Sequence, residues 1–387
     1  MWLSAPKLRL GLLGIALLGV LAGCSSNEPF EEPAPLPEVV NSVVLDDAWS
    51  TSIGDGYDDE YLHLQPLVTT DNLYAVSADG ELVSIDPETG TRQWERDLDQ
   101  RVMAGVGGDS QNLYLVSDNA RLMAYSREDG KSGWEASLPN EVLAPPQSNG
   151  TIVVVQTIDG KVLAFDVQSG EKKWQYDGVV PALTVRATAT PLVGGEVALV
   201  SFANGQLFAL STDTGQPVWQ YTVGEPKGRT ELERLVDVTS QPVVIDTAAI
   251  ITGYQGHLAA IDLRNGQEIW SRPMSSFRSP AIARGNVYVA KANGDVVAVD
   301  GSTRKIVWTQ DKLAWRQLTQ PIVVGDYLLV GDYEGYLHVL SLDNGTFQGQ
   351  LEFDSDGLRA PMQRWRDLII VYGNGGHLAA LKLETDN

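Results

Sequence analysis

The short apolar segments of this chain, such as 73–76 and 81–85, are separated by glycine, proline and other polar turn residues. Within these segments the apolar positions recur with a period of two, which predicts half-buried β-strands, whereas an amphipathic helix needs a period near 3.6. One segment differs, because residues 10–21 form an almost unbroken apolar run. The pattern predicts an all-β body that follows a short apolar N-terminal segment.

One unit repeats through the all-β body. A tryptophan, a glycine fourteen residues before it and a proline fourteen residues before that glycine recur in five units, and three further units keep part of this register. The repeat tryptophans are Trp49, Trp94, Trp134, Trp174, Trp219, Trp270 and Trp308. Four short strands per unit of 38 to 51 residues are typical of a propeller blade. We therefore expect an eight-bladed β-propeller of four-stranded antiparallel blades.

Turn residues set the register within each unit. Asp79-Gly80 predicts a tight hairpin in the first unit, because glycine readily adopts the positive φ of such a turn. Gly90 marks the following turn, and Trp94 belongs to the fourth strand. A large ring at this repeated position is suited to cover the glycine turns between neighbouring blades. The tryptophans are therefore predicted to be structural and not to form a ligand cage.

The two ends of the repeat region complement each other. The last unit, 361–383, has three predicted strands and lacks the tryptophan strand, whereas segment 43–49 is a tryptophan strand without three preceding strands. Pairing these segments completes the eighth blade, closes the ring and removes an exposed sheet edge. The predicted propeller domain spans residues 46–387.

The N-terminal residues predict a lipoprotein signal peptide, 1–23. Lys7 and Arg9 accompany the apolar run, which is too short to span a bilayer but suits the core of a signal peptide. The run ends in Leu21-Ala22-Gly23-Cys24, which resembles a bacterial lipobox; the alternative is an ordinary secretory signal with a chance cysteine. The resemblance implies cleavage before Cys24, lipidation of Cys24 and, because Ser25 follows, sorting to the outer membrane.

Residues 24–45 predict a lipidated, flexible tether. This segment is rich in proline and glutamate, a composition that favours an extended chain without a packed core. It would hold the folded propeller away from the membrane.

The charge of the chain narrows the choice of partners. Lys and Arg total 28 against 50 Asp and Glu, which gives a net charge of -22. Such an acidic surface repels phosphate backbones and anionic headgroups, so it excludes nucleic-acid binding and leaves membrane attachment to the acyl chains. Cys24 is the only cysteine, so no intramolecular disulfide can form. No Ser/His/Asp or metal-ligand spacing stands out, so we predict no catalytic residue, no metal site and no cofactor.

The repeat resembles the pyrroloquinoline-quinone (PQQ) enzyme-like repeat over the whole body of the chain. Quinoprotein dehydrogenases, one family with this repeat, typically place two adjacent cysteines against the quinone and are considerably longer than this chain. The lipoprotein subunit BamB of the outer-membrane β-barrel assembly machinery is a second such family. It fits the lipobox, the tether, the length and the eight blades together. A quinoprotein dehydrogenase and a glycan-binding propeller remain the alternatives.

Two neighbouring interblade connections are longer than most of the others. From the tryptophan to the next repeat proline, most units hold 10 to 13 residues, but 17 separate Trp174 from Pro191 and 23 separate Trp219 from Pro242. Strand parity places both connections on the same face of the ring, at successive junctions. Both contain apolar residues beside arginine, a combination typical of interface hot spots. We therefore expect them to form one binding patch.

In the BamB family these connections resemble the segments that grip the barrel-forming subunit. Val185 stands in place of a leucine of the first family motif, Leu-x-Leu-Arg, and Thr239 in place of the last aspartate of the second, Asp-Arg-Leu-x-Asp-x-Asp. Alternatively, Leu183 and Leu235 only pack the loops onto the propeller rim. The partner-binding residues that the resemblance implies are Leu183, Val185, Arg186, Arg234, Leu235 and Asp237.

The resemblance implies a non-catalytic, periplasm-facing outer-membrane lipoprotein that scaffolds the assembly and insertion of β-barrel proteins. Its expected partner is the barrel-forming subunit, bound through the periplasmic (POTRA) domains of that subunit. The expected mechanism is to hold and orient these domains without chemistry or nucleotide. Binding of unfolded outer-membrane proteins is compatible with this function, although no residue of the sequence points to it.

Overall fold

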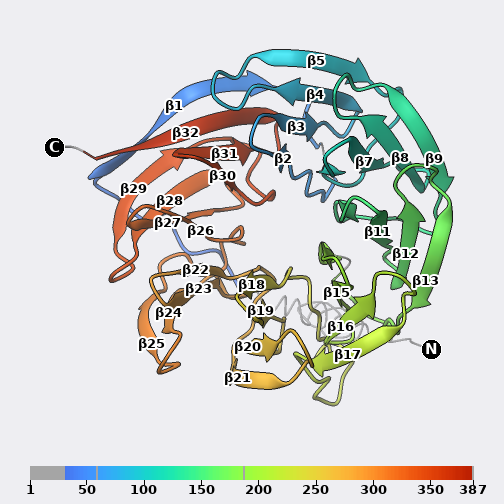
Figure 1. Ribbon diagram of the computed structural model, residues 1–387. Helices are drawn as coiled ribbons and strands as arrows, with labels where there is room; N and C mark the ends of the chain where they lie inside the picture. Colours follow the sequence, from blue (N-terminus) through green and yellow to red (C-terminus); the bar gives the residue numbers. More distant parts are fainter. Residues whose placement is uncertain (1–30, 58–59, 186–187, 386–387) are drawn as a thin grey trace, which may run out of the picture. The chain divides into compact units, whose positions relative to one another are not determined.

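The computed structural model describes residues 31–57, 60–185 and 188–385. In this part of the chain, eight four-stranded antiparallel sheets stand around a common axis as the blades of a ring (Figure 1). The predicted all-β, eight-bladed propeller is confirmed. No helix among the described residues is long and apolar enough to cross a membrane.

Each blade is built from four strands in order from the axis outward. The innermost strands are short: β2 (Leu67–Val68), β6 (Gly107–Gly108), β10 (Gln147–Ser148), β14 (Leu192–Val193), β18 (Val243–Ile245), β22 (Ala281–Ala283), β26 (Ile322–Val324) and β30 (Gln363–Trp365). The second strands are β3 (Leu73–Val76), β7 (Asn112–Val116), β11 (Ile152–Gln156), β15 (Val197–Ser201), β19 (Ala248–Thr252), β23 (Asn286–Ala290), β27 (Tyr327–Gly331) and β31 (Leu368–Tyr372).

The outer half of each blade carries the longer strands. The third strands are β4 (Glu81–Ile85), β8 (Arg121–Ser126), β12 (Lys161–Asp166), β16 (Gln206–Ser211), β20 (His257–Asp262), β24 (Val296–Asp300), β28 (Tyr336–Ser341) and β32 (His377–Thr385). The outermost strands are β5 (Arg92–Asp97), β9 (Ser132–Ser137), β13 (Lys172–Asp177), β17 (Pro217–Thr222), β21 (Glu268–Pro273), β25 (Ile306–Gln310), β29 (Phe347–Glu352) and β1 (Val43–Ser52).

The hydrophobic core is divided among the junctions between blades. The second and third strands are buried on both faces, because each blade packs against two neighbours. The buried apolar residues of the described chain fall into eight clusters, each shared by two adjacent blades. No single core has to grow with chain length, so one domain can exceed the usual size of a globular unit.

The repeat tryptophans join each blade to the next. The ring of Trp174, which is 7% exposed, lies over Gly215 in the following blade, and its indole N–H donates to the carbonyl of Thr212 at 2.7 Å. A Cβ at Gly215 would come within 2.6 Å of this ring, so the turn needs glycine both for its φ of +71° and for space. The prediction that these tryptophans are structural is confirmed.

The N-terminal strand closes the ring. β1 pairs antiparallel with β32, from Val43 opposite Thr385 to Ser52 opposite His377, and completes the eighth blade. The predicted closure is therefore confirmed, and β1 begins at Val43, three residues before the predicted domain boundary at residue 46. Trp49 of β1 packs over Gly90 of the first blade, so the closing strand makes the same contact as the other outer strands.

The seventh blade has Gly349 where the repeat has tryptophan. A Cβ at Gly349 would lie 2.3 Å from the carbonyl oxygen of Val43, so the start of β1 occupies the space beside it. In the eighth blade, β32 is not followed by a turn into the outer strand, because the outer strand comes from the N-terminus. A tryptophan at position 349 would therefore have no glycine turn to cover.

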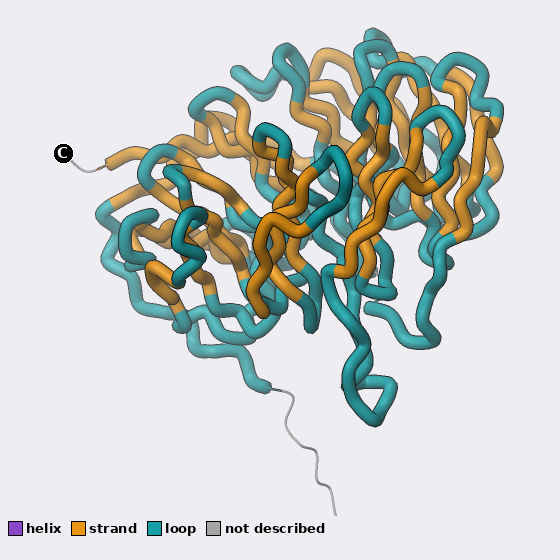
Figure 2. Tube along the Cα trace, turned by 60° about the horizontal axis from the view of Figure 1, so that its bottom comes forward, coloured by secondary structure: helices purple, strands orange, loops and turns teal. Residues whose placement is uncertain are grey.

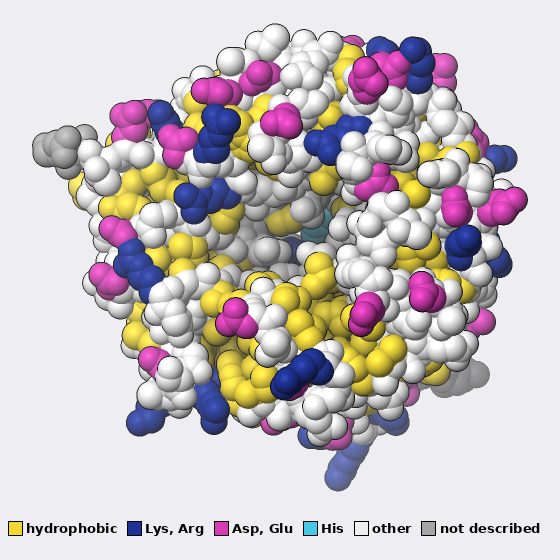
Figure 3. All heavy atoms as spheres, viewed as in Figure 1, with side chains coloured by type: hydrophobic (Ala, Val, Ile, Leu, Met, Phe, Trp, Pro, Cys, Tyr) yellow, Lys and Arg dark blue, Asp and Glu magenta, His cyan; other side chains and the backbone are white. Residues whose placement is uncertain are grey.

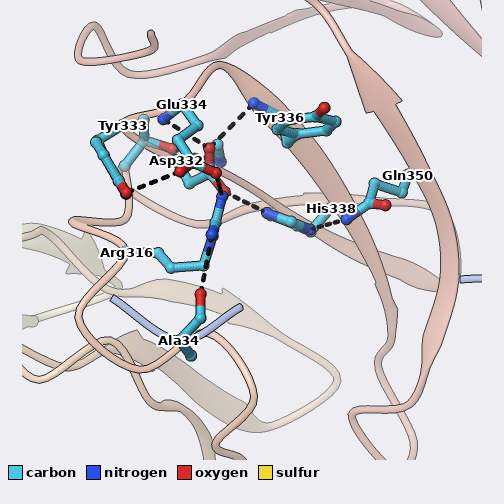
Figure 4. Close-up of polar contacts among 10 residues, drawn as sticks. Ala34, Arg316, Asp332, Tyr333, Glu334, Tyr336, His338 and Gln350 are labelled. Carbon is cyan, nitrogen blue, oxygen red and sulfur yellow. Dashed lines mark hydrogen bonds and ion pairs between the residues drawn. The ribbon is translucent and has the colours of Figure 1, made fainter. Parts of the chain in front are cut away.

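The segment before β1 lies against the seventh blade and the loop that precedes it. The backbone N–H of Ala34 donates to the carbonyl of Ala314 at 2.8 Å, and the Arg316 guanidinium donates to the carbonyl of Ala34 at 3.0 Å (Figure 4). Further along, Ser42 donates its N–H to the carbonyl of Gln348 in β29. The later part of the predicted 24–45 tether thus contacts the propeller, whereas residues 24–30 lie outside the described residues.

A buried polar network holds the arginine of this contact. The Nε of Arg316 donates to Asp332 at 2.7 Å, and the Nε2 of His338 lies 2.8 Å from the same carboxylate (Figure 4). All three side chains are buried, and Glu334 forms a second ion pair with Arg316. The Arg316 guanidinium and the two carboxylates satisfy one another, which is the condition for retaining charge in a protein interior.

Candidate functional site

The two long connections leave adjacent blade junctions. The first, residues 178–191, runs from β13 to β14, and the second, residues 223–242, runs from β17 to β18. Figure 2 shows that the connections of the propeller extend beyond the strand ends to different extents. Because the two connections belong to successive junctions, they lie close enough to contact each other.

The first connection is fixed to the propeller on one side and exposed on the other. Val180 packs on the hairpin turn at Gly160, where an added Cβ would lie 2.4 Å from the valine methyl group. Leu183 and Val185 are 40% and 38% exposed. Arg186, the predicted cation of this motif, lies outside the described residues. Both apolar residues of the motif are thus open to solvent in the described part of the connection.

The second connection contains a capped turn. The backbone N–H of Glu233 donates to the hydroxyl of Thr230 at 3.2 Å, and the Glu233 carboxylate accepts from the backbone N–H groups of Arg229 and Thr230. This reciprocal pattern is a capping box. It holds the turn that carries Arg234, which is exposed, and Leu235, which is half-buried.

Asp237 links the two connections. Its side chain is 1% exposed, and its carboxylate accepts the backbone N–H of Val185 at 3.2 Å. Burial raises the pKa of Asp237 to about 6, although hydrogen bonds from the backbone of Val185 and Val238 oppose this rise. The backbone of Asp237 also pairs with that of Tyr254. The carboxylate therefore faces the inside of the loop pair and fixes the position of Val185.

The structure adds two residues to those suggested by the sequence motifs. Val179 and Leu232 are 72% and 69% exposed, and both belong to the long connections. Sequence reasoning missed them because they fall outside the motifs; their signal is a bulky apolar residue in a segment that contributes no strand. Together with Leu183 and Val185 they place four exposed apolar side chains on two loops that touch.

The repeated aspartates and histidines noted in the repeat have structural partners where the structure describes them, as three of them show. The carboxylate of Asp86 accepts backbone N–H groups of its own turn, as expected for a turn residue. His257 and His377 occupy equivalent strand positions and contact the carbonyls of Val223 and Phe353. Over the described residues, no group of three or more His, Cys, Asp or Glu side chains is arranged to hold a metal ion.

Comparison with known proteins identifies the family. The sequence model described as outer membrane protein assembly factor BamB matches residues 78–310. The outer membrane protein assembly factor BamB of Marinobacter adhaerens is 65% identical over 373 residues, which are 96% of this chain and 96% of that protein. The chain belongs to the BamB family. The BamB of Pseudomonas aeruginosa is 45% identical over 370 residues, 95% of this chain and 97% of that protein.

Solved structures agree with the BamB assignment. The crystal structure of BamB from Moraxella catarrhalis matches with a TM-score of 0.80 at 26% identity and covers 88% of this chain and 100% of that one. The quinohemoprotein alcohol dehydrogenase of Comamonas testosteroni matches with a TM-score of 0.68 at 14% identity, over 87% of this chain and 76% of that one. The second likeness reflects the propeller fold alone.

Membership in the BamB family settles the class of function. The chain is an outer membrane protein assembly factor and not an enzyme, as the sequence resemblance implied. The dehydrogenase alternative shares only the propeller fold with this chain.

Proposed function

We propose that the two long connections bind the periplasmic POTRA domains of the barrel-forming subunit of the assembly machinery. The hydrogen bond between Val185 and Asp237 is the observation that carries this proposal, because it joins two loops from different junctions into one surface. Exposed apolar side chains on that surface offer area that a partner can bury.

The residues of the surface have different roles in this proposal. Leu183 and Val185 are apolar anchors, and Arg234, together with Arg186 from the sequence motif, supplies planar cations for hydrogen bonds to the partner. Leu235 is half-buried, so only part of its side chain is open to a partner. Asp237 is a positioning residue, because its buried carboxylate holds the backbone of Val185. The mechanism is positional: the propeller holds a partner domain in one orientation.

Replacement of Leu183 by glutamate tests this proposal. The change removes an anchor and adds a charge to an already acidic protein, so affinity for the purified periplasmic domains should fall at least about thirty-fold, which corresponds to about 2 kcal/mol. Biolayer interferometry measures the affinity, and circular dichroism checks the fold. Val307→Glu is the matched control, because Val307 is 48% exposed on β25 of another blade. Equal affinities for Leu183→Glu and the control variant would refute the proposal.

We also propose that acylated Cys24 attaches the protein to the periplasmic side of the outer membrane. The lipobox-like sequence and the family assignment support this anchor. Cys24→Ala should leave the thermal midpoint of the propeller unchanged but remove the protein from the outer-membrane fraction. Sucrose-gradient fractionation of cell envelopes measures this, and an outer-membrane fraction equal to that of the unsubstituted protein would contradict the proposal.

A further inference from the structure

All eight interblade connections contribute to one cavity at the axis of the ring. The cavity has a volume of about 430 Å³, within the range typical of small-molecule sites. Its lining comes mainly from the residues just before each innermost strand, from Gln65 before β2 to Arg359 before β30. Figure 3 shows that the ring is hollowed at its centre. The cavity is therefore a product of ring closure and belongs to no single blade.

The charge of this cavity is opposite to that of the chain. Arg278, Lys291 and Arg359 line it, and no Asp or Glu is among its lining residues. Lys291 is paired with Asp295 at 2.7 Å, so the two arginines supply the unpaired positive charge of the described lining. The whole chain, in contrast, has 50 acidic residues against 28 basic ones. Such an excess of cations inside a confined space favours an anionic ligand, because the surrounding protein limits screening by water.

The two arginines are held in place without a carboxylate partner. Arg278 donates its Nε–H to the carbonyl of Leu318 at 2.8 Å, and Arg359 donates to the carbonyl of Glu60 at 2.8 Å. The Arg359 guanidinium also lies 4.7 Å from the ring centre of Tyr61. Neither arginine takes part in an ion pair within residues 31–57, 60–185 and 188–385. Each guanidinium has five N–H donors, so both keep donors for a ligand.

His63 shows that both arginine charges act at the same place. Its Nδ1 lies 3.1 Å from the carbonyl oxygen of Arg359. Burial, together with the charges of Arg278 and Arg359, lowers the pKa of His63 to about 3. The imidazole therefore stays neutral near pH 7, and the positive charge of this wall comes from the two arginines.

The rest of the lining is mostly uncharged and partly apolar. Phe277, Leu318 and Met362 line the cavity at the sixth, seventh and eighth blades. The two arginines come from the sixth and the eighth of these blades. A ligand that fits this lining has one anionic end and one apolar or aromatic part. Val185 and Thr239 of the long connections also line the cavity, so it adjoins the surface proposed for partner binding.

We propose that the axial cavity binds an amphiphilic carboxylate, with the carboxylate between Arg278 and Arg359 and the apolar part against Phe277, Leu318 and Met362. Guanidinium groups match a carboxylate in geometry as well as in charge. The same chemistry has two sources, a free small acid or the C-terminal residue of a polypeptide. This inference does not depend on the partner proposed for the long connections.

Calorimetric titration of the purified full-length protein with 4-phenylbutyrate tests the proposal. We expect saturable binding of this acid and at least tenfold weaker binding of its neutral amide, 4-phenylbutyramide. Equal affinity for acid and amide, equal affinity for inorganic phosphate, or no binding of the acid would overturn the proposal. These comparisons need no variant, so they hold even if a substitution disturbs the fold.

Variants then locate the site. Arg278→Gln and Arg359→Gln should each weaken 4-phenylbutyrate binding at least tenfold. Arg366→Gln should bind like the unsubstituted protein: this arginine also stacks on an aromatic ring, that of Trp365, but lies outside the cavity lining. Unchanged binding by both cavity variants would refute the assignment.

Short peptides distinguish the two sources of the carboxylate. Tighter binding of acetyl-Gly-Gly-Gly-Leu than of 4-phenylbutyrate, with loss of binding on C-terminal amidation, would support a polypeptide end as the ligand. Binding of 4-phenylbutyrate without binding of the peptide would support a free acid.

Discussion

The outer rim of the ring and the face with the interblade connections differ in how strictly they repeat. On the rim, six tryptophans pack over a glycine turn in the next blade in the same way, as Trp174 does over Gly215. On the connection face, segment 223–242 is longer than all its equivalents, segment 178–191 is longer than most of them, and neither shares its composition with another blade. The rim repeats because each of these junctions packs a large ring against a tight turn of the next blade.

The connection face diverges because its residues lie outside the strand register. A connection can change length without shifting a buried strand, so binding residues accumulate there on a rigid scaffold. The difference teaches that repetition in this chain marks stability, and that departures from the repeat mark ring closure and, under the proposed function, partner binding. Gly349 is a departure on the rim itself, and it coincides with the point where β1 enters the ring.

Loss of a rim tryptophan should have the largest effect on stability. Trp174→Ala removes a buried ring and its hydrogen bond to Thr212, so the free energy of unfolding should fall by about 3–5 kcal/mol. Urea unfolding followed by circular dichroism measures this loss. Trp315→Ala is the control, because Trp315 is 39% exposed and stands outside the repeat. An equal loss in both variants would show that the rim contact has no special role.

Substitution of Asp237 should change the pH dependence of stability. The pKa of Asp237 is about 6 in the folded protein and near 3.8 when unperturbed, so between these values the folded form keeps a proton that the unfolded form has lost. This group therefore lowers stability as pH rises from about 4 to 6.

Asp237→Asn removes this titration, and its amide oxygen can still accept the N–H of Val185. Relative to the unsubstituted protein, its free energy of unfolding should be higher at pH 7.5 than at pH 4.5 by up to about 3 kcal/mol. The thermal midpoint measured at both pH values follows this change. Asp213→Asn, in an exposed turn, serves as the control. A constant difference between Asp237→Asn and the unsubstituted protein at both pH values would contradict the buried position of this carboxylate.

Gly349, where the rim lacks a tryptophan, should not tolerate an added Cβ. Gly349→Ala places a Cβ 2.3 Å from the carbonyl oxygen of Val43 and should cost about 1–3 kcal/mol by displacing the start of β1. Gly195→Ala is the matched control, because no atom lies within 4 Å of a Cβ there. Differential scanning calorimetry compares the two variants. A midpoint for Gly349→Ala at or above that of the control would mean that β1 does not fill this space.

The amino-acid sequence by itself determined the fold of this protein. The spacing of proline, glycine and tryptophan specifies turns and buried rings, and these are local constraints that act within one unit and its neighbour. The same local pattern indicated the closing strand, because 43–49 and 361–383 each lacked what the other had. The two long connections were also visible, since loop length can be counted along the chain.

Only the tertiary structure decided what the side chains of the connections do. Asp237 looks like a surface acid in the sequence, but the fold buries it against Val185, 52 residues away. The axial cavity was missed for the same reason, because its cations come from different blades. The three positions that precede each repeat proline supply most of the lining residues, including His63 and Arg278. Burial and charge at the axis depend on all eight connections converging, and this convergence exists only after the ring has closed.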